Sequence, residues 1–594
     1  MAEIKRIFDL LDLYKNQYND KSDVFGSKEN GEWIGVSAST YIQMVNVLSS
    51  GLLALGLKKG DNVATIMNNR PEWNFLDMAL MQIGAVQIPI YPTISTDNYK
   101  YIFEQAEIKY AFINNEKINC RLQPFIKELS EFKELYSVDP VSGVKSWEEI
   151  IKLGTDNLNI ETIDKIKESI TEDDIATIIF TSGTTGFPKG AMISHGNFVS
   201  NFLACAPVIA GKQLDKALSF LPLCHVYERL LNYMYQYCNV SVYYAVSIEK
   251  VGENIREISP DIFCAVPRLL EKTYDKIIAK GRNLTGIKKF LFFWAVRLGR
   301  KFDHHTNNTW YNFRLGIARK LIFSKWTEAL GGKLQIIVSG GAALHPDLAR
   351  VFWAAGISVM EGYGLTETSP VIAVNNFEPK GTKIGTVGPV VAGVSVRIAE
   401  DGEILVKGPN VMKGYYKDPV RTAEMIDKDG WLHTGDIGMM DEGRYLKITD
   451  RKKEIFKTSG GKYVAPQQIE NKFKSSSFIE NIMVVGEFKK YTAAIIVPEF
   501  SHVESWCKIK GIEFGDNQKA IQNKLIIKRF AKEVAQLNKG LDKVEKIKKF
   551  RLISDIWSSN TGELSPTLKL KRKDLLQHYK DIINSFYPDE IYEE

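Results

Sequence analysis

Long apolar runs are missing from this sequence of 594 residues. A helix needs about 20 consecutive apolar residues to cross a bilayer, so we expect no membrane-spanning segment. The first nine residues also lack the apolar core of a secretory signal. The two absences favour a cytoplasmic protein over a secreted or integral membrane protein.

Cysteine is scarce, and no two cysteines lie close together in the sequence. Closely spaced pairs are typical of zinc ribbons and disulfide frameworks, so we expect reduced thiols instead. Asp303 is the only residue near His304 and His305 in the sequence that could join them in binding a metal ion. This favours a solvated loop over a metal site. The six cysteines are Cys120, Cys205, Cys224, Cys238, Cys264 and Cys507.

Acidic residues are almost absent from one long segment. Residues 272–326 contain 13 Lys and Arg but only Asp275 and Asp303, a net charge of +11, whereas the whole chain carries +6. The rest of the chain is therefore net negative. A basic charge so concentrated in one segment suggests an anionic partner for that segment.

The overall composition is that of a globular protein, with 44% hydrophobic and 25% charged residues. A chain of this length needs two or more domains. Helix-like and strand-like patterns alternate in the first half: a helix over 37–57, a strand over 62–67, a helix over 71–83 and a strand over 85–91. Further strands are predicted near 218–223, 262–266, 334–338 and 357–361. This alternation predicts an α/β fold with doubly wound, mainly parallel sheets, whose ligands bind at the carboxyl ends of the strands.

The pattern changes beyond about Gly381 to short strands with glycine turns, which predicts a small β-rich subdomain. The dense charged segment 445–454 is a plausible interdomain hinge. After it we expect a smaller, mobile α+β domain with a helix starting at 465–470, a hairpin over 482–486 and 492–497, and one long helix over 517–537. We therefore divide the chain into domains 1–450 and 451–594.

The ten residues from Thr181 to Gly190 follow a strand-like stretch and combine three glycines, four hydroxyl residues and Lys189. Successive N–H groups in such a loop form an anion-binding concavity, and the lysine neutralises phosphate charge. In a P-loop a Ser or Thr would follow the lysine, but here Gly190 does. The alternative is a polar surface turn between a strand and a helix. The expected phosphate-binding residues are Thr181, Ser182, Gly183, Thr184, Thr185, Gly186 and Lys189.

All ten positions resemble the phosphate loop of AMP-forming acyl-adenylating enzymes, the superfamily of acyl-CoA synthetases, luciferases and peptide-synthetase adenylation domains. Residues 361–368 resemble its second signature. The resemblance implies that Glu367, with Thr184, holds Mg²⁺ and that Thr366 contacts the α-phosphate or acyl oxygen. A buried glutamate with a structural partner is the alternative for Glu367. The resemblance also implies that four residues of this signature bind the nucleotide: Glu361, Gly362, Tyr363 and Gly364.

Two more segments resemble parts of the nucleotide site. Gly340, Gly341 and Ala342 end a predicted strand, and the resemblance places adenine and part of the acyl pocket against them. Asp436, at the end of a third signature, would accept hydrogen bonds from the ribose hydroxyls, and Arg451 would also reach the ribose. Taken alone, a turn-forming aspartate is the simpler interpretation of Asp436.

The C-terminal segment 562–572 resembles the segment that carries the catalytic lysine of the superfamily, which we place at Lys569. Leu568 and Ser565 depart from the usual glycine and threonine, and Lys571 and Lys573 are alternatives. A solvated basic tail is the simpler interpretation. The resemblance also implies a hinge at Lys453 and a thioester-forming face with Lys457, Gly460 and Gly461.

The reaction that the resemblance implies uses ATP, Mg²⁺ and coenzyme A. An acid first forms an acyl-adenylate with release of pyrophosphate, and a thiol then displaces AMP. Residues 219–229 resemble the long-chain fatty-acyl-CoA synthetases, in which His225 would flank the acyl carboxyl. Alternatives are another acid, an acyl-carrier-protein acceptor, or a catalytically silent lipid or nucleotide binder.

The basic segment 272–326 supports a lipid substrate, because residues 288–301 mix bulky apolar and cationic residues as an interfacial helix does. We expect reversible peripheral contact with an anionic membrane on its cytoplasmic face. The alternative is a helical insertion that packs on the core and presents a solvated basic face. No motif for nucleic acid binding accompanies the charge.

Overall fold

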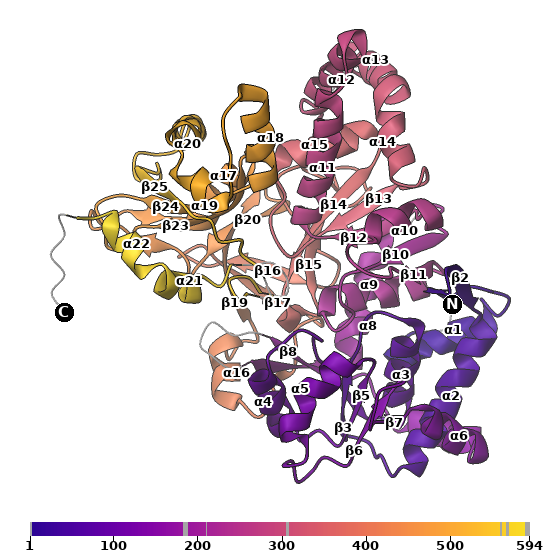
Figure 1. Ribbon diagram of the computed structural model, residues 1–594. Coiled ribbons are helices and arrows are strands. Elements are labelled where there is room, and N and C mark those ends of the chain that lie inside the picture. The colour runs from indigo at the N-terminus through magenta and orange to yellow at the C-terminus, as the bar shows by residue number, and fades with distance from the viewer. Residues whose placement is uncertain are drawn as a thin grey trace.

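The computed structural model describes residues 3–181, 188–209, 211–304, 308–558, 561–565 and 570–588. It is an α/β structure in which the C-terminal elements gather to one side of a larger body (Figure 1). This confirms the expected fold class of doubly wound sheets, a small β-rich part and a smaller C-terminal part. The order of strands within each sheet shows how the site is built.

The first large sheet holds the phosphate loop at its edge. Its six parallel strands are β8 (Ile175–Thr181), β4 (Val86–Pro89), β3 (Asn62–Ile66), β5 (Tyr110–Ile113), β6 (Glu134–Ser137) and β7 (Lys145–Ser146). Two antiparallel strands, β9 (Lys189–Ser194) and β18 (Gly414–Tyr415), extend it beyond β8. The connecting helices include α2 (Ala38–Ala54), α3 (Pro71–Gln82), α4 (Thr96–Gln105) and α5 (Glu116–Ile126). The predicted alternation of strands and helices over 37–91 is therefore confirmed.

The second large sheet is parallel through its centre and antiparallel at both edges. Its order is β15 (Val371–Val374), β14 (Ser358–Gly364), β13 (Ile336–Ser339), β12 (Ile262–Ala265), β10 (Lys216–Ser219), β11 (Ser241–Tyr244), β1 (Phe25–Glu29) and β2 (Glu32–Val36). Helices α8 (His195–Cys205), α9 (Val226–Tyr237) and α15 (Pro346–Ala355) accompany it. The largest hydrophobic cluster contains residues of both large sheets and of α8 and α9, so the two sheets share one core.

A four-stranded antiparallel sheet forms the expected β-rich part. Its order is β16 (Ser395–Ile398), β17 (Glu403–Lys407), β19 (Leu432–Asp441) and β20 (Tyr445–Arg451). The prediction that 445–454 is a hinge is wrong for its first seven residues, because they pair with β19 as far as Asp436 opposite Arg451. Only the residues after Arg451 are left to form the connection.

The C-terminal elements are β21 (Phe456–Lys457), β22 (Tyr463–Val464), α17 (Pro466–Lys474), β23 (Ile479–Val485), β24 (Ala493–Pro498), α18 (Phe500–Lys510), α19 (Asn517–Gln522), α20 (Lys524–Leu537), β25 (Lys549–Leu552), α21 (Arg572–His578) and α22 (Lys580–Ser585). The predicted hairpin is β23–β24. The single helix predicted over 517–537 is wrong, because Asn523 is extended and its side chain caps α20 by accepting from the Leu525 N–H. Two hydrophobic clusters here draw only on residues from Phe456 onward. On that ground we propose the domain boundary at 450/451.

The basic segment forms a helical projection. It contains α11 (Pro267–Arg282), α12 (Gly286–Gly299), α13 (Thr309–Ala318), a π-helical turn η3 (Arg319–Phe323) and α14 (Ser324–Ala329). Figure 1 shows α12 and α13 reaching out from the body. Within the described ranges, no helix combines the length and apolar character needed to span a bilayer. The other helical elements are η1 (Ile7–Asp9), α1 (Leu10–Asn16), α6 (Glu148–Asp156), α7 (Ile160–Glu168), η2 (Ala206–Ile209), α10 (Val251–Ile258), η4 (Thr366–Thr368) and α16 (Pro419–Met425).

Candidate active site

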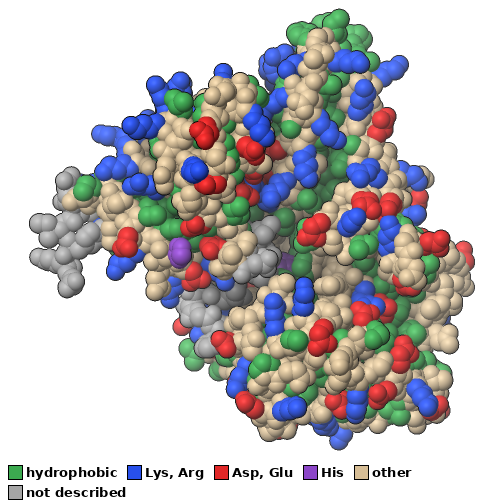
Figure 2. All heavy atoms as spheres, viewed as in Figure 1, with side chains coloured by type: hydrophobic (Ala, Val, Ile, Leu, Met, Phe, Trp, Pro, Cys, Tyr) green, Lys and Arg blue, Asp and Glu red, His purple; other side chains and the backbone are tan. Residues whose placement is uncertain are grey.

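A cleft of about 2450 Å³ lies where the two large sheets, the four-stranded sheet and the C-terminal elements meet. Figure 2 shows the surface hollowed between these parts. The cleft is lined by most of the site residues predicted from sequence: Thr181, Lys189, His225, Gly340, Gly341, Ala342, Glu361, Gly362, Tyr363, Gly364, Thr366, Glu367, Asp436, Arg451 and Lys453.

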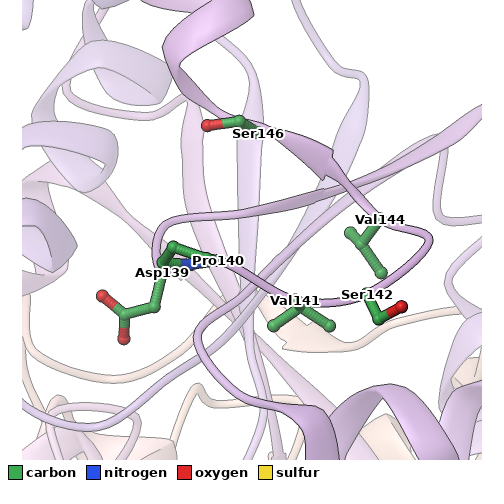
Figure 3. Close-up of a pocket in the computed structure, with 6 residues that line it drawn as sticks. All are labelled: Asp139, Pro140, Val141, Ser142, Val144 and Ser146. Carbon is green, nitrogen blue, oxygen red and sulfur yellow. The ribbon is translucent and has the colours of Figure 1, made fainter.

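A smaller pocket of about 400 Å³ lies at the turn between β6 and β7 (Figure 3). The Asp139 carboxylate at its edge accepts a hydrogen bond from Arg70 Nη1 at 2.7 Å. The other lining residues are prolyl, valyl and seryl side chains, which bring no cation and no second carboxylate. The larger cleft, which is lined by charged groups of both signs, is therefore the candidate active site.

The phosphate loop connects two antiparallel strands, since Thr181 of β8 pairs with Lys189 of β9. The loop is thus closed by a β-hairpin, and the alternative of a turn between a strand and a helix is wrong. Hairpin pairing brings Lys189 back to the carboxyl end of β8, where parallel sheets bind ligands. Ser182, Gly183, Thr184, Thr185 and Gly186 lie outside the described residues.

Lys189 and Glu367 both contact Tyr415. The Lys189 Nζ lies 5.0 Å from the centroid of the Tyr415 ring, and the Tyr415 hydroxyl donates to Glu367 Oε1 at 2.7 Å. Burial, followed by the Glu367 charge, raises the pKa of Tyr415 well above its usual value, so the phenol stays a donor. Tyr415 is not among the site residues predicted from the sequence. The only signal for it was its place at the start of the signature that ends at Asp436.

The position of Glu367 depends on a tight turn between β14 and β15. A Cβ added at Gly364 would lie 1.7 Å from the carbonyl oxygen of Pro370, so only glycine fits there. The Leu365 N–H donates to Thr368 Oγ1 at 2.9 Å. The turn therefore holds Thr366 and Glu367 at the edge of the cleft.

The glycines after β13 face the signature strand β14, with Ser339 opposite Glu361. A Cβ at Gly340 would come within 2.9 Å of the Tyr227 ring, and Gly341 adopts φ +82°, a conformation that favours glycine. Burial raises the pKa of Glu361 to about 8, against hydrogen bonds from the Leu344 and Gly385 N–H groups. A flat, weakly polar ring could lie against this surface.

Asp436 lies at the centre of a small polar group. Its Oδ2 accepts from the Tyr363 hydroxyl at 2.7 Å, and its Oδ1 lies 3.4 Å from Arg451 Nε. Asp436 and Arg451 are cross-strand partners in β19 and β20, although 15 residues separate them in the sequence. Burial and the Asp436 charge raise the pKa of Tyr363, so this phenol also remains a donor. The group offers a carboxylate to neighbouring hydroxyls.

His225 caps the start of α9, where its Nδ1 accepts from the Tyr227 N–H at 3.2 Å. Its ring meets Tyr91 edge-on, with centroids 6.4 Å apart. Beside it the lining of the cleft is apolar and comes from η2, α9, β13 and β15. These residues include Val208, Ile209, Val226, Leu231, Met234, Val338, Val371 and Val374.

The residues predicted for the second half-reaction lie apart from the others. Lys457 and Gly461 are exposed in the β21–β22 hairpin, where Lys457 Nζ lies 5.0 Å from the Tyr463 ring centroid. Neither they nor Gly460 line the cleft, whereas Ser565 and residues 570–573 do. Lys569 itself lies outside the described residues.

The cleft suits a magnesium ion that is shared with a nucleotide. Magnesium is usually bound through one or two carboxylates together with substrate phosphates. Among the described residues no three His, Cys, Asp or Glu side chains converge on one point. Glu367, buried and connected to Lys189 through Tyr415, therefore fits an ion held jointly with phosphate oxygens.

Comparison with known proteins shows the family of the chain. Residues 15–416 match the AMP-binding enzyme model and residues 453–590 the AMP-binding enzyme C-terminal domain. The chain is 32% identical over 570 residues to the long-chain-fatty-acid–CoA ligase FadD15 of Mycobacterium bovis, covering 94% of each. It is 32% identical over 603 residues to the human long-chain-fatty-acid–CoA ligase 6, covering 94% of this chain and 83% of that protein.

Solved structures show the same fold. An anthranilate CoA ligase in complex with anthranoyl-AMP superposes with a TM-score of 0.73 at 16% identity, covering 98% of both chains. ATP-bound MatB from Rhodopseudomonas palustris gives a TM-score of 0.70 at 22% identity, covering 98% of this chain and 100% of that one. On its sequence match and its fold, the chain belongs to the AMP-binding enzyme family.

Proposed function

We propose that this protein is an AMP-forming ligase that joins long-chain fatty acids to coenzyme A. The observation that carries the proposal is the single cleft in which Lys189, Glu367 and Asp436 lie beside an apolar lining. Lys189 and Glu367 suit a polyphosphate with its metal ion, and the buried Asp436 carboxylate suits a ribose. The apolar lining suits an alkyl chain. The full-length relatives with long-chain-fatty-acid–CoA ligase names support the acid class.

In the first step a carboxylate oxygen of the acid attacks the α-phosphorus of ATP, and the bond to the pyrophosphate oxygen breaks. Lys189 would neutralise phosphate charge, Thr366 would contact the reacting oxygens and Asp436 would orient the ribose. Magnesium bound by Glu367 would supply further charge neutralisation. Lys569, as a mobile ammonium, would bridge the acid and the α-phosphate. No covalent nucleophile is needed, because positioning and charge neutralisation lower the barrier.

In the second step a thiolate attacks the acyl carbon and AMP leaves. We propose that Lys457, Gly460 and Gly461 form the face that admits the thiol, after the C-terminal domain turns about Lys453. The residues proposed for the thiol side and those next to Lys569 belong to the same small domain. The segments on either side of Lys569 line the cleft in this structure. This lining supports an arrangement suited to the first step.

Pyrophosphate release with ATP, Mg²⁺ and a ladder of saturated acids tests the proposal. We expect release to peak at long chains and to turn over only with coenzyme A. Release that does not depend on coenzyme A would indicate a carrier-protein acceptor. No release with any acid would favour a silent binder, although such a protein would have no need of Lys189, Glu367 and Asp436 together.

Two substitutions separate the half-reactions. Lys569→Ala should abolish pyrophosphate release and leave ATP binding intact. Gly461→Leu should leave pyrophosphate release intact and block thioester formation, because a side chain would fill the thiol path. Equal loss of both half-reactions in each variant would contradict the two-face mechanism.

We further propose a cytoplasmic protein that contacts the inner membrane face peripherally through residues 272–326. The support is the net charge of +11 in that segment, since each basic residue near an anionic surface contributes roughly 1 kcal/mol. The contact should be seen as co-sedimentation with anionic liposomes at low salt, and its failure there would contradict it.

A further inference from the structure

One face of α13 is apolar and exposed. Trp310, Phe313, Ile317 and Leu321 follow each other at intervals of three, four and four residues, the spacing of a single helical face. Their exposed fractions are 66, 60, 39 and 47%. Leu315 and Ala318, on the other side of the helix, are buried in the core of the projection. A stripe of bulky side chains thus faces solvent along the length of α13 and η3.

Helix α12 extends this face. The two helices run antiparallel, because the Tyr311 hydroxyl donates to Leu298 O at 3.0 Å and the Arg314 guanidinium lies 5.6 Å from the Trp294 ring centroid. The start of α12 therefore lies beside the end of α13 and η3. It brings two more exposed side chains there, Ile287 at 77% and Phe290 at 64%. We call these six residues the apolar stripe: Ile287, Phe290, Trp310, Phe313, Ile317 and Leu321.

Cations flank the apolar stripe. Between residues 276 and 327 the only acidic residue is Asp303. Lys288, Lys289 and Lys320 are exposed next to stripe residues in the sequence. Figure 2 shows green side chains at the outer end of the projection and blue ones along its sides. An apolar face with a cationic border is complementary to an anionic bilayer, whose headgroups attract the lysines while its acyl chains receive the stripe.

A second copy of the chain fits this face less well. Symmetric dimers bring the same patch of both subunits together, so the lysines of one copy would face the lysines of the other. Like charges placed opposite each other across an interface weaken it. A continuous exposed patch of this kind nevertheless needs a partner, because scattered single side chains are the norm on free surfaces.

We propose that the apolar stripe inserts into the headgroup and acyl boundary of an anionic bilayer. This rests on the proposed peripheral contact of 272–326 and adds insertion by six named residues to the attraction of charges. Helix α11 connects the stripe to the cleft, since Arg268 and Leu269 line the cleft and Arg282 ends the helix beside α12. Its 16 residues span about 24 Å at 1.5 Å per residue. The cleft would then stand a short distance from the membrane that holds its lipid substrate.

The test uses the full chain and vesicles of phosphatidylcholine with or without phosphatidylglycerol, sedimented at about 0.01 M and at about 0.5 M NaCl. The screening length falls from about 30 Å to about 4 Å between these salt concentrations, which suppresses binding by charge alone. The stripe variant is Trp310→Ser with Phe313→Ser, and the charge variant is Lys288→Gln with Lys289→Gln. The matched control is Ile509→Ser with Leu525→Ser, two exposed apolar residues on the C-terminal domain. We expect the stripe variant to bind at least tenfold more weakly and to lose all salt-resistant binding, while the control binds as the wild type does.

Quenching by lipids brominated along the acyl chain gives a second readout. The wild-type fluorescence should fall on vesicles, and Trp310→Phe should lose most of that quenching while still binding. Binding lost only in the charge variant would overturn insertion and leave the peripheral contact standing. No binding by the wild type would overturn both, and a change from dimer to monomer in the stripe variant would show that a second copy covers the face. Pyrophosphate release with a soluble acid, measured in parallel, reports on the ligase activity independently.

Discussion

At the scale of single residues, Arg229 shows how a sequence motif can have a structural basis. This arginine belongs to the 219–229 segment that resembles long-chain synthetases, yet it is fully buried and does not line the cleft. Its Nη2 lies 2.5 Å from Asp77 Oδ1, and its Nε donates to the Tyr233 hydroxyl at 2.7 Å. The motif therefore contains one partner of a buried ion pair.

Replacing Arg229 should destabilise the fold without changing the acid that is used. Arg229→Leu leaves the Asp77 carboxylate buried without its cation, which costs about 3–5 kcal/mol. Urea unfolding should show this loss, and Asp77→Leu in the same chain should restore much of it. An altered chain-length profile at unchanged stability would instead place Arg229 in substrate recognition.

Glu228 should make stability depend on pH. Burial raises its pKa to about 8, against a hydrogen bond from Ser219, whose Oγ donates to Glu228 Oε1 at 2.6 Å. The carboxyl is then neutral in the folded protein, whereas in the unfolded chain it ionises above about 4.5. Its contribution to stability is full below pH 4.5 and is lost as the pH rises to about 8.

Glu228→Gln cannot ionise, so the variant should gain stability relative to the wild type over that window. The gain is up to roughly 1.4 kcal/mol for each pH unit and should level off at higher pH. Urea midpoints of both proteins at several pH values measure it. A difference that does not change with pH would show that Glu228 is ionised in the fold.

At the scale of elements, the β14–β15 turn connects backbone geometry to chemistry. Gly364→Ala would force a Cβ to within 1.7 Å of Pro370 O and move the residues that follow, Thr366 and Glu367. We expect pyrophosphate release to fall at least tenfold, which corresponds to about 1.4 kcal/mol in the barrier.

Gly252→Ala is the control for this substitution. Gly252 is the second residue of α10, and no atom outside its chain neighbours and the backbone of its own helix lies within 4 Å of an added Cβ, so alanine fits. Alanine here should stabilise the protein by at most about 0.5–1 kcal/mol, the gain in a helix interior, and leave activity unchanged. Unaltered activity of Gly364→Ala would mean that the turn does not position Glu367.

At the scale of the whole molecule, ion pairs hold the C-terminal domain in its observed place. Arg268 Nη2 on α11 lies 3.2 Å from Glu480 Oε1 at β23, and Lys272 Nζ lies 3.9 Å from the same oxygen. Partly exposed pairs of this kind contribute about 0.2–1 kcal/mol each. They favour the arrangement in which the segments flanking Lys569 line the cleft.

Glu480→Arg should therefore slow pyrophosphate release by roughly twofold to tenfold, since the repulsion removes that preference. Thioester formation from a supplied acyl-adenylate should be unchanged or faster. The charge swap Arg268→Glu with Glu480→Arg should recover the first step. Failure of the swap to recover it would show that the pair does not set the domain arrangement.

Local residue patterns were enough to predict the fold class and the family, and they also gave the candidate residues with the clearest chemistry. Local signals suffice for these: alternating strand and helix periodicity, the glycine and hydroxyl pattern of 181–190, and the spelling of 361–368. Each depends on neighbours within a few positions, so a reader of the chain can find Lys189 and Glu367 without knowing what surrounds them.

Which side chains meet became visible only in the folded structure. Tyr415 lies 226 residues after Lys189 and 48 residues after Glu367 yet contacts both, and Arg229 pairs with Asp77 and does not line the cleft. Residues 445–451 form a strand because they pair with β19. Asn523 interrupts the helix that the apolar periodicity of 517–537 predicts. The apolar stripe exists because α12 and α13 pack antiparallel by their other faces. Such outcomes depend on contacts between distant segments, which local residue patterns do not encode.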